Sequence, residues 1–374
     1  MLNNFLMKTR NIYSLNMQIY KHIKVLLGWR NWAVFTYNSF IENIFVIFYV
    51  VLALNDFSNT LLRNILIFYC FSILSTSYGY LVNDYGDIDL DTLHGKKNTF
   101  LGMRKIYALL YVLSAFLLSV ILAIPFLKQD FFLVFWMIWI FFTTSYSTKP
   151  LRLKEKGKYG LIIVVLAQRL LPILLVFAAF NYLYLIDVCI ISLYVLFRGL
   201  SSDLNHQLED YQLDVRTSTT TFVVNRGFDA SQKIFTTILR IERVLLLIFL
   251  LRMGLLLGEE YSISTLIIWM FFTLYVFMLL KAEIITIKGY FHNPFSKNEK
   301  NIMQFIHHPF PTIVLPFLLL LFLVRYNFFY VIFFIILIIN KNLFNSKVLK
   351  NNFLYLSFAR FSKKSDRTGG SINH

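Results

Sequence analysis

The sequence predicts an all-α polytopic membrane protein with about nine transmembrane helices. Of its 374 residues, 57% are hydrophobic and 15% are charged, whereas soluble domains carry about 25% charged residues. Apolar runs of about 20 residues, the length that crosses a bilayer as a helix, recur along the whole chain. These observations exclude a water-soluble fold, and they leave no soluble module that would bind nucleic acid.

Each apolar run is assigned to one helix. The nine expected spans lie near residues 33–54, 62–82, 106–126, 131–146, 160–180, 184–202, 234–257, 264–287 and 303–324. A further apolar stretch, 328–339, is short for a span and would add a tenth helix. The first run follows a long polar and basic segment and exceeds the hydrophobic region of a signal peptide, so we expect it to be retained.

The chain divides into four segments on this basis. Residues 1–32 form a cytoplasmic or interfacial N-terminal segment, in which apolar residues recur at helical spacing with basic residues between them. Residues 33–325 form the membrane domain, 326–345 hold the additional short helix, and 346–374 form a polar, basic tail. If the short helix enters the membrane, the tail returns to the face of the N-terminus.

The distribution of basic residues predicts the orientation. Lys and Arg gather in the N-terminal segment and in the second, fourth, sixth and eighth connections, whereas the opposite connections carry Arg63 and Lys128. The positive-inside rule places the first group in the cytoplasm. The net charge of +16 therefore reflects topology and attraction to anionic lipid headgroups.

An acidic cluster ends the second apolar run. Asp84, Asp87 and Asp91 follow one another at steps of three and four and so share one helical face. Asn83 joins the edge of that face, while Asp89 points elsewhere. Because like charges stacked on one face repel each other in a low dielectric, they stay ionised only when cations neutralise them.

A second acidic cluster follows the sixth run, with Asp203, His206, Asp210 and Asp214 as a stripe at helical steps. Either cluster alone is explained equally well by solvated carboxylates at a helix end. Their placement on the same cytoplasmic face favours a shared site. Oxygen-only ligands suit Mg²⁺, which binds through one or two carboxylates plus substrate phosphates.

Basic residues accompany these clusters on the same face. The connection after the fourth run carries Arg152 and Lys154, Lys96 follows the first cluster, and Arg198 precedes the second. Basic side chains beside metal-bound carboxylates would hold a diphosphate and stabilise its charge as it leaves. For Arg152 and Lys154 the alternative is ordinary anchoring at the cytoplasmic face.

Three segments resemble motifs of a known family, the UbiA superfamily of intramembrane prenyltransferases. The first cluster, Asn83-Asp84-x-x-Asp87-x-x-x-Asp91, is similar to its NDxxDxxxD motif. Asp210-x-x-x-Asp214 resembles its second DxxxD motif, and Tyr146-Ser147…Pro150-Leu151-Arg152-Leu153-Lys154 resembles its YSxPPxRLK loop. The resemblance covers about residues 30–325; Lys149 departs from it by replacing the first proline of the loop.

The resemblance implies an all-helical fold around a central cavity and a Mg²⁺-dependent transfer of a prenyl group. The donor would be an allylic polyprenyl diphosphate, and an aromatic acceptor is favoured. The implied catalytic and metal-binding residues are Asp84, Asp87, Asp91, Asp210 and Asp214. The implied diphosphate-binding residues are Asn83, Arg152, Lys154, Lys96 and Arg198.

Three other classes compete with this interpretation. An enzyme of the same fold would cyclise a prenyl diphosphate without an acceptor, and the sequence does not separate it from a transferase. A cation transporter would place its acids at mid-membrane in broken helices, whereas these lie at one face beside a basic loop. A CDP-alcohol phosphotransferase is disfavoured because Asp87 is followed by Ile88 and the required glycine and arginine spacing is absent.

Overall fold

The computed structural model describes residues 17, 19–30, 33–36, 38–93, 95–217, 219–260, 262–287, 293–295 and 301–346. Residues 1–16 and nearly all of the predicted tail, 347–374, lie outside this description. Within it, every regular element is helical. The chain forms two compact units that interleave in sequence: unit 1 comprises Met1–Glu42, Arg63–Asn181 and Gln207–Ser231, and unit 2 comprises Asn43–Leu62, Tyr182–His206 and Gln232–His374.

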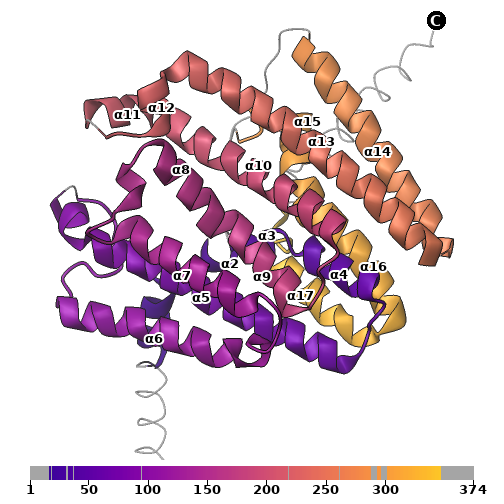
Figure 1. Ribbon diagram of the computed structural model, residues 1–374, viewed down its shortest axis with the longest axis horizontal. Coiled ribbons are helices and arrows are strands. Elements are labelled where there is room, and N and C mark those ends of the chain that lie inside the picture. The colour runs from indigo at the N-terminus through magenta and orange to yellow at the C-terminus, as the bar shows by residue number, and fades with distance from the viewer. Residues whose placement is uncertain are drawn as a thin grey trace, which may run out of the picture. The chain divides into compact units, whose positions relative to one another are not determined.

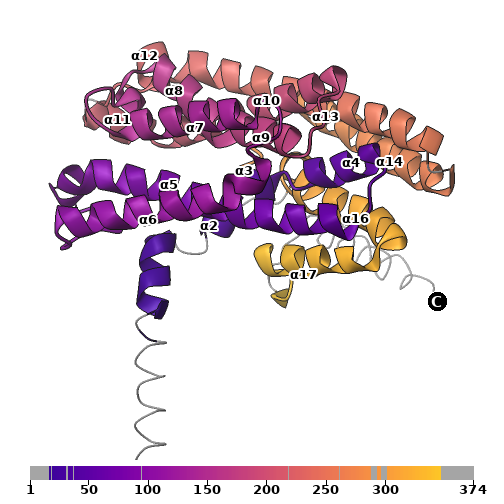
Figure 2. The same ribbon diagram turned by 60° about the horizontal axis from the view of Figure 1, so that its bottom comes forward.

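Unit 1 is built around the long helix α5 (Asn59–Leu93), which enters it at Arg63. It also contains α2 (Ala33–Thr36), α3 (Ser39–Glu42), α6 (Lys105–Ala123), α7 (Phe132–Ser147), α8 (Lys158–Val165), α9 (Leu171–Ala179), α11 (Tyr211–Arg216) and α12 (Phe222–Arg226). The helices α5 and α6 lie side by side in an antiparallel pair (Figures 1 and 2). Helix α7 packs against both α8 and α9.

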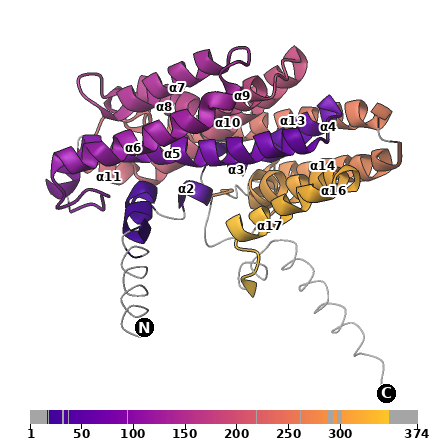
Figure 3. The ribbon, with the colours of Figure 1, turned by 90° about the horizontal axis from the view of Figure 1, so that it is seen from below.

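Unit 2 contains α4 (Phe45–Leu54), most of α10 (Leu185–Glu209), most of α13 (Phe228–Glu260), α14 (Ser262–Ile287), α15 (Ile302–His307), α16 (Leu315–Tyr326) and α17 (Val331–Asn340). Helix α16 packs against α4, and α16 and α17 form a hairpin (Figure 3). A helix thus covers the additional short segment predicted from the sequence, and its insertion in the membrane stays a prediction.

Helix α6 shows how the apolar sequence is used. Its buried residues are small or β-branched and recur every three or four positions: Ala108, Val112, Ala115, Ser119 and Ala123. Large apolar side chains face outward at Ile106, Leu110, Leu113, Leu117 and Ile121. Small residues allow helices to approach closely in a membrane, while lipid solvates the large outward ones. This distribution of small buried and large exposed apolar residues is the one expected of a helix in a bilayer.

Six helical segments are long and apolar enough to cross a membrane: Asn59–Leu93, Lys105–Phe126, Lys158–Ala179, Leu185–Glu209, Leu266–Ile287 and Ile302–Tyr326. Three further apolar helices are shorter, at Phe45–Leu54, Phe132–Ser147 and Phe328–Asn340. The all-helical membrane fold is thereby confirmed, but the count of nine spans is not. Helix α13 is not among these segments, because Arg240, Glu242 and Arg243 interrupt its apolar run.

The predicted first span, 33–54, is wrong as a single helix. The structure divides it into α2, α3 and α4. Asn38 starts α3 by accepting hydrogen bonds from the backbone N–H groups of Phe40 at 2.9 Å and Ile41 at 3.4 Å. This side chain competes with the helical hydrogen bonds that the backbone would otherwise make, which is why Asn favours helix starts over helix interiors.

Candidate active site

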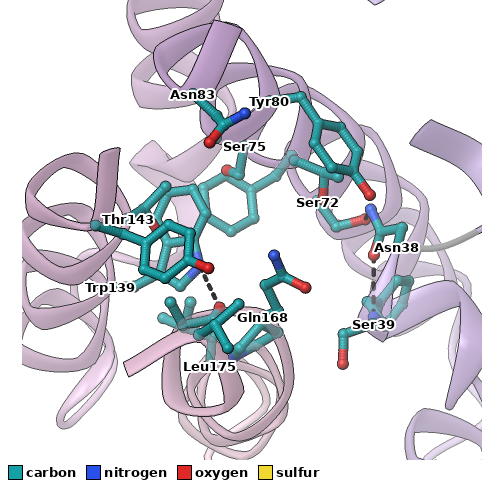
Figure 4. A pocket seen from close by; sticks show the side chains of 18 of the residues that line it. Asn38, Ser39, Ser72, Ser75, Tyr80, Asn83, Trp139, Thr143, Gln168 and Leu175 are labelled. Atoms are coloured by element: carbon teal, nitrogen blue, oxygen red, sulfur yellow. Dashed lines mark hydrogen bonds between the residues drawn. The ribbon is translucent and has the colours of Figure 1, made fainter. Parts of the chain in front are cut away.

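Unit 1 encloses a cavity of about 300 Å³ between α5, α7 and the α8–α9 segment. Aromatic rings form much of its wall, including Phe40, Phe68, Phe71 and Trp139. Hydroxyl, amide and aliphatic side chains form most of the rest (Figure 4). An apolar chamber with a few convergent polar groups is the usual form of a small-molecule site. The cavity is therefore the candidate site of this unit.

One face of α5 supplies a continuous wall. Its cavity-lining residues follow helical steps of three and four: Phe68, Phe71, Ser72, Ser75, Thr76, Gly79, Tyr80 and Asn83. The same face continues into the predicted acidic cluster, since Asp87 lies one turn beyond Asn83. The helix therefore carries the cavity wall and the candidate metal ligands in one line.

Asn83 lies at the polar end of the cavity, and Asp87 follows it one helical turn further along α5. The Ser147 hydroxyl donates to Asn83 Oδ1 at 2.7 Å. Arg152 Nη2 donates to Asp87 Oδ1 at 2.8 Å, and Lys154 Nζ forms a short ion pair with the other oxygen of Asp87. The acidic end of α5 and the basic loop, which is the connection between α7 and α8 that carries Arg152 and Lys154, are far apart in the sequence but meet here.

Arg152 is held in an unusual conformation. Its φ of 40° lies in the left-handed region, which few residues other than glycine adopt. Its guanidinium donates to the carbonyls of Gly86 at 3.2 Å and Ser147 at 3.3 Å, in addition to its ion pairs with Asp87 and Glu155. Strained backbone that surrounding contacts maintain is frequent at functional sites.

The pKa values of the two basic residues of the loop shift in opposite directions. Burial, the largest influence, would lower the pKa of Arg152, but its hydrogen bonds to Glu155 and Asp87 together raise it. Burial lowers the pKa of Lys154, and the adjacent Asp87 offsets only part of this effect. A nearby anion therefore favours the charged form of Lys154.

Asp84 and Asp91 have partners of their own. Asp84 is almost fully buried and accepts from Arg30 Nη1 at 2.7 Å and from the Thr99 hydroxyl at 2.5 Å. Asn98 donates to the backbone carbonyl of Asp84 at 2.7 Å and to Asp91 Oδ2 at 2.8 Å. The loop after α5 thus folds back along its acidic face and fixes these two carboxylates.

Close backbone approaches set the geometry. A Cβ atom at Gly86 would lie 2.6 Å from the carbonyl oxygen of Ser147, closer than side chains come. At Gly160 a Cβ atom would lie 2.9 Å from the carbonyl oxygens of Leu153 and Lys154. Glycine at these two positions lets α5 approach the end of α7 and lets α8 approach the backbone of Leu153 and Lys154.

The second acidic cluster is not the continuous helical stripe that the sequence predicts. Helix α10 ends at Glu209 and α11 begins at Tyr211, so the turn at Asp210 interrupts it. Burial raises the pKa of Asp214, and repulsion from Asp210 adds to this effect. Lys96 lies near enough to lower that pKa in part, and its N–H donates to the Asp91 carbonyl at 2.9 Å. Lys96 therefore lies close to both acidic segments, within unit 1.

The candidate metal ligands have the donor atoms that Mg²⁺ prefers. Every candidate ligand offers oxygen, the donor that hard cations prefer. Within the described residues, no group of three or more His, Cys, Asp and Glu side chains converges on one point. Mg²⁺ often binds through one or two carboxylates and completes its shell with substrate phosphates, and this arrangement of carboxylates is compatible with that mode.

Other residues that the sequence singled out lie elsewhere. Asp89 points away from the cluster, as predicted, and pairs with Lys105 at 2.9 Å on the exposed side of α5. Arg198 belongs to unit 2, where it is buried and donates to the Tyr194 hydroxyl at 3.0 Å and to the His307 carbonyl. Its role in diphosphate binding stays a prediction.

Sequence reasoning missed three residues of the site. Arg30 was counted as part of the basic N-terminal segment, although it lines the cavity and lies 4.7 Å from the ring centres of Trp29 and Tyr80. Thr99 and Gln168 carry no motif. Arg30 had one signal: it is the basic residue next to the first apolar run. Nothing in the sequence marked the other two.

Comparison with known proteins gives a family and a fold. The model of the UbiA prenyltransferase family matches residues 44–288, more than half of the chain. Among curated proteins, no sequence matches. A structure of a UbiA homolog from Archaeoglobus fulgidus bound to GPP and Mg²⁺ has a TM-score of 0.55 at 16% identity, over 82% of this chain and 99% of that chain. A structure of digeranylgeranylglyceryl phosphate synthase has a TM-score of 0.50 at 16% identity, over 81% and 98%.

These features define an integral membrane protein whose helices enclose a largely apolar cavity with a charged end. The chain belongs to the UbiA prenyltransferase family. The predicted family is thereby confirmed. At 16% identity the solved structures show the shared fold alone.

Proposed function

We propose that this protein is a Mg²⁺-dependent intramembrane prenyltransferase, which moves a prenyl group from an allylic polyprenyl diphosphate to an acceptor. One observation carries the proposal. A cavity of apolar, aromatic and polar residues extends along one face of α5 to Asn83, and one helical turn beyond it Asp87 forms ion pairs with Arg152 and Lys154. A prenyl diphosphate has the same division between an apolar chain and a polyanionic end.

The polar end of the donor would lie beside Asp87, Arg152, Lys154 and Lys96. The proposed metal ligands are Asp84, Asp87, Asp91, Asp210 and Asp214, with Asn83 as a further oxygen donor. Mg²⁺ bound there would neutralise phosphate oxygens and stabilise the leaving diphosphate. A bound diphosphate would add a second anion beside Lys154, next to Asp87, and would further favour its charged form, because burial lowers its pKa.

The chemistry begins with cleavage of the carbon–oxygen bond of the allylic diphosphate. The diphosphate keeps the electron pair, and an allylic cation remains. Rings that line the cavity, such as Trp139, Tyr80 and Phe71, offer faces that attract a cation. The cavity wall also limits the access of water, which would otherwise capture it. The acceptor then forms the new bond to carbon and loses a proton.

Orientation is part of the proposal. The excess of Lys and Arg on the N-terminal segment and alternate connections favours a cytoplasmic location for the acidic clusters and the basic loop. A cytoplasmic site would receive water-soluble acceptors and release diphosphate into the cytoplasm. The apolar chain of the donor would enter from the bilayer.

Diphosphate release from the purified protein tests the proposal. The protein in detergent is incubated with allylic diphosphates of several chain lengths and a panel of aromatic acceptors, with Mg²⁺ or with EDTA. We expect Mg²⁺-dependent release that Asp87→Ala and Asp210→Ala abolish. Asp89→Ala is the matched control, because Asp89 lies on the same helix but pairs with Lys105 at the exposed side.

The products separate the competing functions. A product with the combined mass of acceptor and prenyl group identifies a transferase, whereas a cyclic hydrocarbon or cyclic alcohol that forms without acceptor identifies a cyclase. If no diphosphate binds or leaves under any condition, while Asp87→Ala changes cation flux in liposomes, the transporter interpretation replaces ours.

A further inference from the structure

The inner part of the unit 1 cavity contains polar groups that the diphosphate end does not use. Ser75 is 6% exposed, and its hydroxyl has no hydrogen-bond partner within the described structure. Ser75 lines the cavity and points into it, and Gln168 points into the same space from the opposite wall (Figure 4). A buried hydroxyl without a partner costs free energy, so a ligand that supplies the partner would be favoured here.

The backbone is shaped to present Gln168. Residues Leu166–Leu170 form a π-helical turn between α8 and α9, a feature that inserts one extra residue and is frequent at functional sites. The wall around it holds the turn in place: Trp139 Nε1 donates to the Ala167 carbonyl at 2.8 Å, and the Ser39 hydroxyl donates to the Arg169 carbonyl at 3.4 Å. Arg169 itself forms an ion pair with Glu42.

Other polar residues of the inner wall are engaged with one another. Asn38 donates to the Ser72 hydroxyl at 3.2 Å, and its amide oxygen accepts two backbone N–H groups of α3. Ser72 also donates to the Tyr69 carbonyl at 2.8 Å. The polar groups of Asn38 and Ser72 are therefore satisfied by the protein itself, whereas Ser75 and Gln168 face the space of the cavity.

Charge is confined to the mouth. Among the described residues that line the cavity, Arg30 is the one charged side chain, and it is paired with Asp84 at 2.7 Å. A ligand carboxylate at the level of Ser75 would thus be buried without a counter-ion, which is costly. A hydroxyl or carbonyl group would meet matching hydrogen-bond partners there.

The spacing fits a molecule that reaches from the mouth to this level. Ser75 and Asn83 are eight residues apart on one helix, which corresponds to about 12 Å along its axis. The reacting end of an acceptor would lie toward Asn83 and its remote polar group toward Ser75. The apolar chain of the donor, which shares this cavity, would leave both polar side chains unsatisfied if it lay at the level of Ser75.

We propose that Ser75 and Gln168 bind the remote hydroxyl or carbonyl group of the acceptor, and that the acceptor is uncharged. This inference rests on the proposed prenyltransferase function. It names the acceptor class as a neutral phenol, alcohol or quinone-like ring in place of an aromatic carboxylate. Gln168 can both donate and accept, so it suits either a hydroxyl or a carbonyl.

A matched pair of probes tests the charge preference. Methyl 4-hydroxybenzoate is neutral, and 4-hydroxybenzoate carries a carboxylate at neutral pH. Binding of each to the wild-type protein is measured by calorimetry in EDTA without donor, and the KM for each is then measured with Mg²⁺ and geranylgeranyl diphosphate. We expect the ester to bind at least about 10-fold more tightly than the acid.

Variants test the two residues. Gln168→Met and Ser75→Ala should each weaken ester binding about 3- to 10-fold, the effect of one hydrogen bond, and leave the KM for the diphosphate unchanged. Ser77→Ala is the matched control, because Ser77 is on the same helix, is 1% exposed and has an unpartnered hydroxyl, but does not line the cavity.

Two results would overturn the inference: equal binding of ester and acid to the wild-type protein, or an effect of Gln168→Met and Ser75→Ala no larger than that of Ser77→Ala. The comparison of the two probes needs no variant, so it holds even if one variant fails to fold. If the ester binds as expected but no diphosphate is released, the proposed function fails while the binding site stands.

Discussion

The two units of this protein bury charge in different ways. In unit 1, Asp87 and Lys154 lie next to Asn83, a residue of the cavity wall, and keep 13% and 18% of their side-chain surface exposed. In unit 2, Glu242 and Arg198 are each 2% exposed and are enclosed by protein. Both units place ionised side chains among apolar helices, so burial alone does not separate a binding site from a structural ion pair.

The partners explain the difference. Glu242 accepts from His307 Nδ1 at 2.7 Å and from the Ser201 hydroxyl at 2.8 Å, and these contacts satisfy both of its oxygens. Asp187 is likewise buried and accepts from Tyr49 at 2.7 Å and from Arg252 at 2.8 Å. These clusters join α10 to α13 and to α4. Access to a cavity, and not the charge itself, therefore identifies the candidate site of unit 1.

The largest expected effect concerns the stability of unit 2. Glu242→Ala would leave Arg198 and His307 buried beside a missing carboxylate, and breaking such a pair costs about 3–5 kcal/mol. Unfolding in detergent, followed by circular dichroism or scanning calorimetry, measures this loss. Glu283→Ala should lose less, because Glu283 is 32% exposed where it contacts Arg243. A Glu242→Ala protein as stable as the wild type but inactive would move the functional site toward unit 2.

A second prediction concerns unit 1. Arg152→Lys keeps the charge but cannot reproduce the guanidinium contacts to Asp87, Gly86 and Ser147. Hydrogen bonds to charged groups contribute about 1.5–3 kcal/mol, so we expect kcat/KM for the prenyl diphosphate to fall about 10- to 100-fold. Lys105→Arg, at the exposed pair with Asp89, is the control. Equal activity of both variants would show that Arg152 only supports the loop.

Much of this candidate site could be predicted from the sequence, because the arrangement of residues within one helix depends only on their spacing along the chain. Helical periodicity alone placed Asp84, Asp87 and Asp91 on one face and Asp89 on another, and the structure agrees. The pairing of Arg152 and Lys154 with this acidic face was expected because the loop that carries them lies on the same side of the membrane as the acidic clusters. Such arguments need only the spacing of residues within one segment.

The rest depends on contacts between distant segments. Arg30 reaches Asp84 across 54 positions, and Trp139 holds the π-helical turn across 28. An inserted residue that forms such a turn leaves no pattern in hydropathy. The break at Asn38 was missed because its side chain replaces helical hydrogen bonds only in the folded chain. These features are the ones that shape the inner cavity.

A third, smaller effect tests the close packing at the mouth. Gly86→Ala favours the helix by about 1 kcal/mol, but its Cβ would lie 2.6 Å from the backbone carbonyl of Ser147, which cannot turn aside. Overpacking of this kind costs about 1–3 kcal/mol, so we expect lower stability and a displaced basic loop with reduced activity. Gly79→Ala should cost less, because its Cβ would meet the Thr143 methyl group at 3.1 Å, a tight contact but one with a side-chain end that can shift. Equal effects of the two substitutions would argue against a special role of the Gly86 contact.

The smallest expected effect completes the comparison. Asp89 and Lys105 form an ion pair of 2.9 Å, with 80% and 63% of their side-chain surfaces exposed. Water and salt screen such pairs, which contribute about 0–1 kcal/mol. Asp89→Asn should therefore leave both the unfolding temperature and kcat/KM near those of the wild type, in low and in high salt. If it instead abolished diphosphate release, as expected of Asp87→Ala, the acidic end of α5 would act through its total charge, and the assignment of roles by helical face would be wrong.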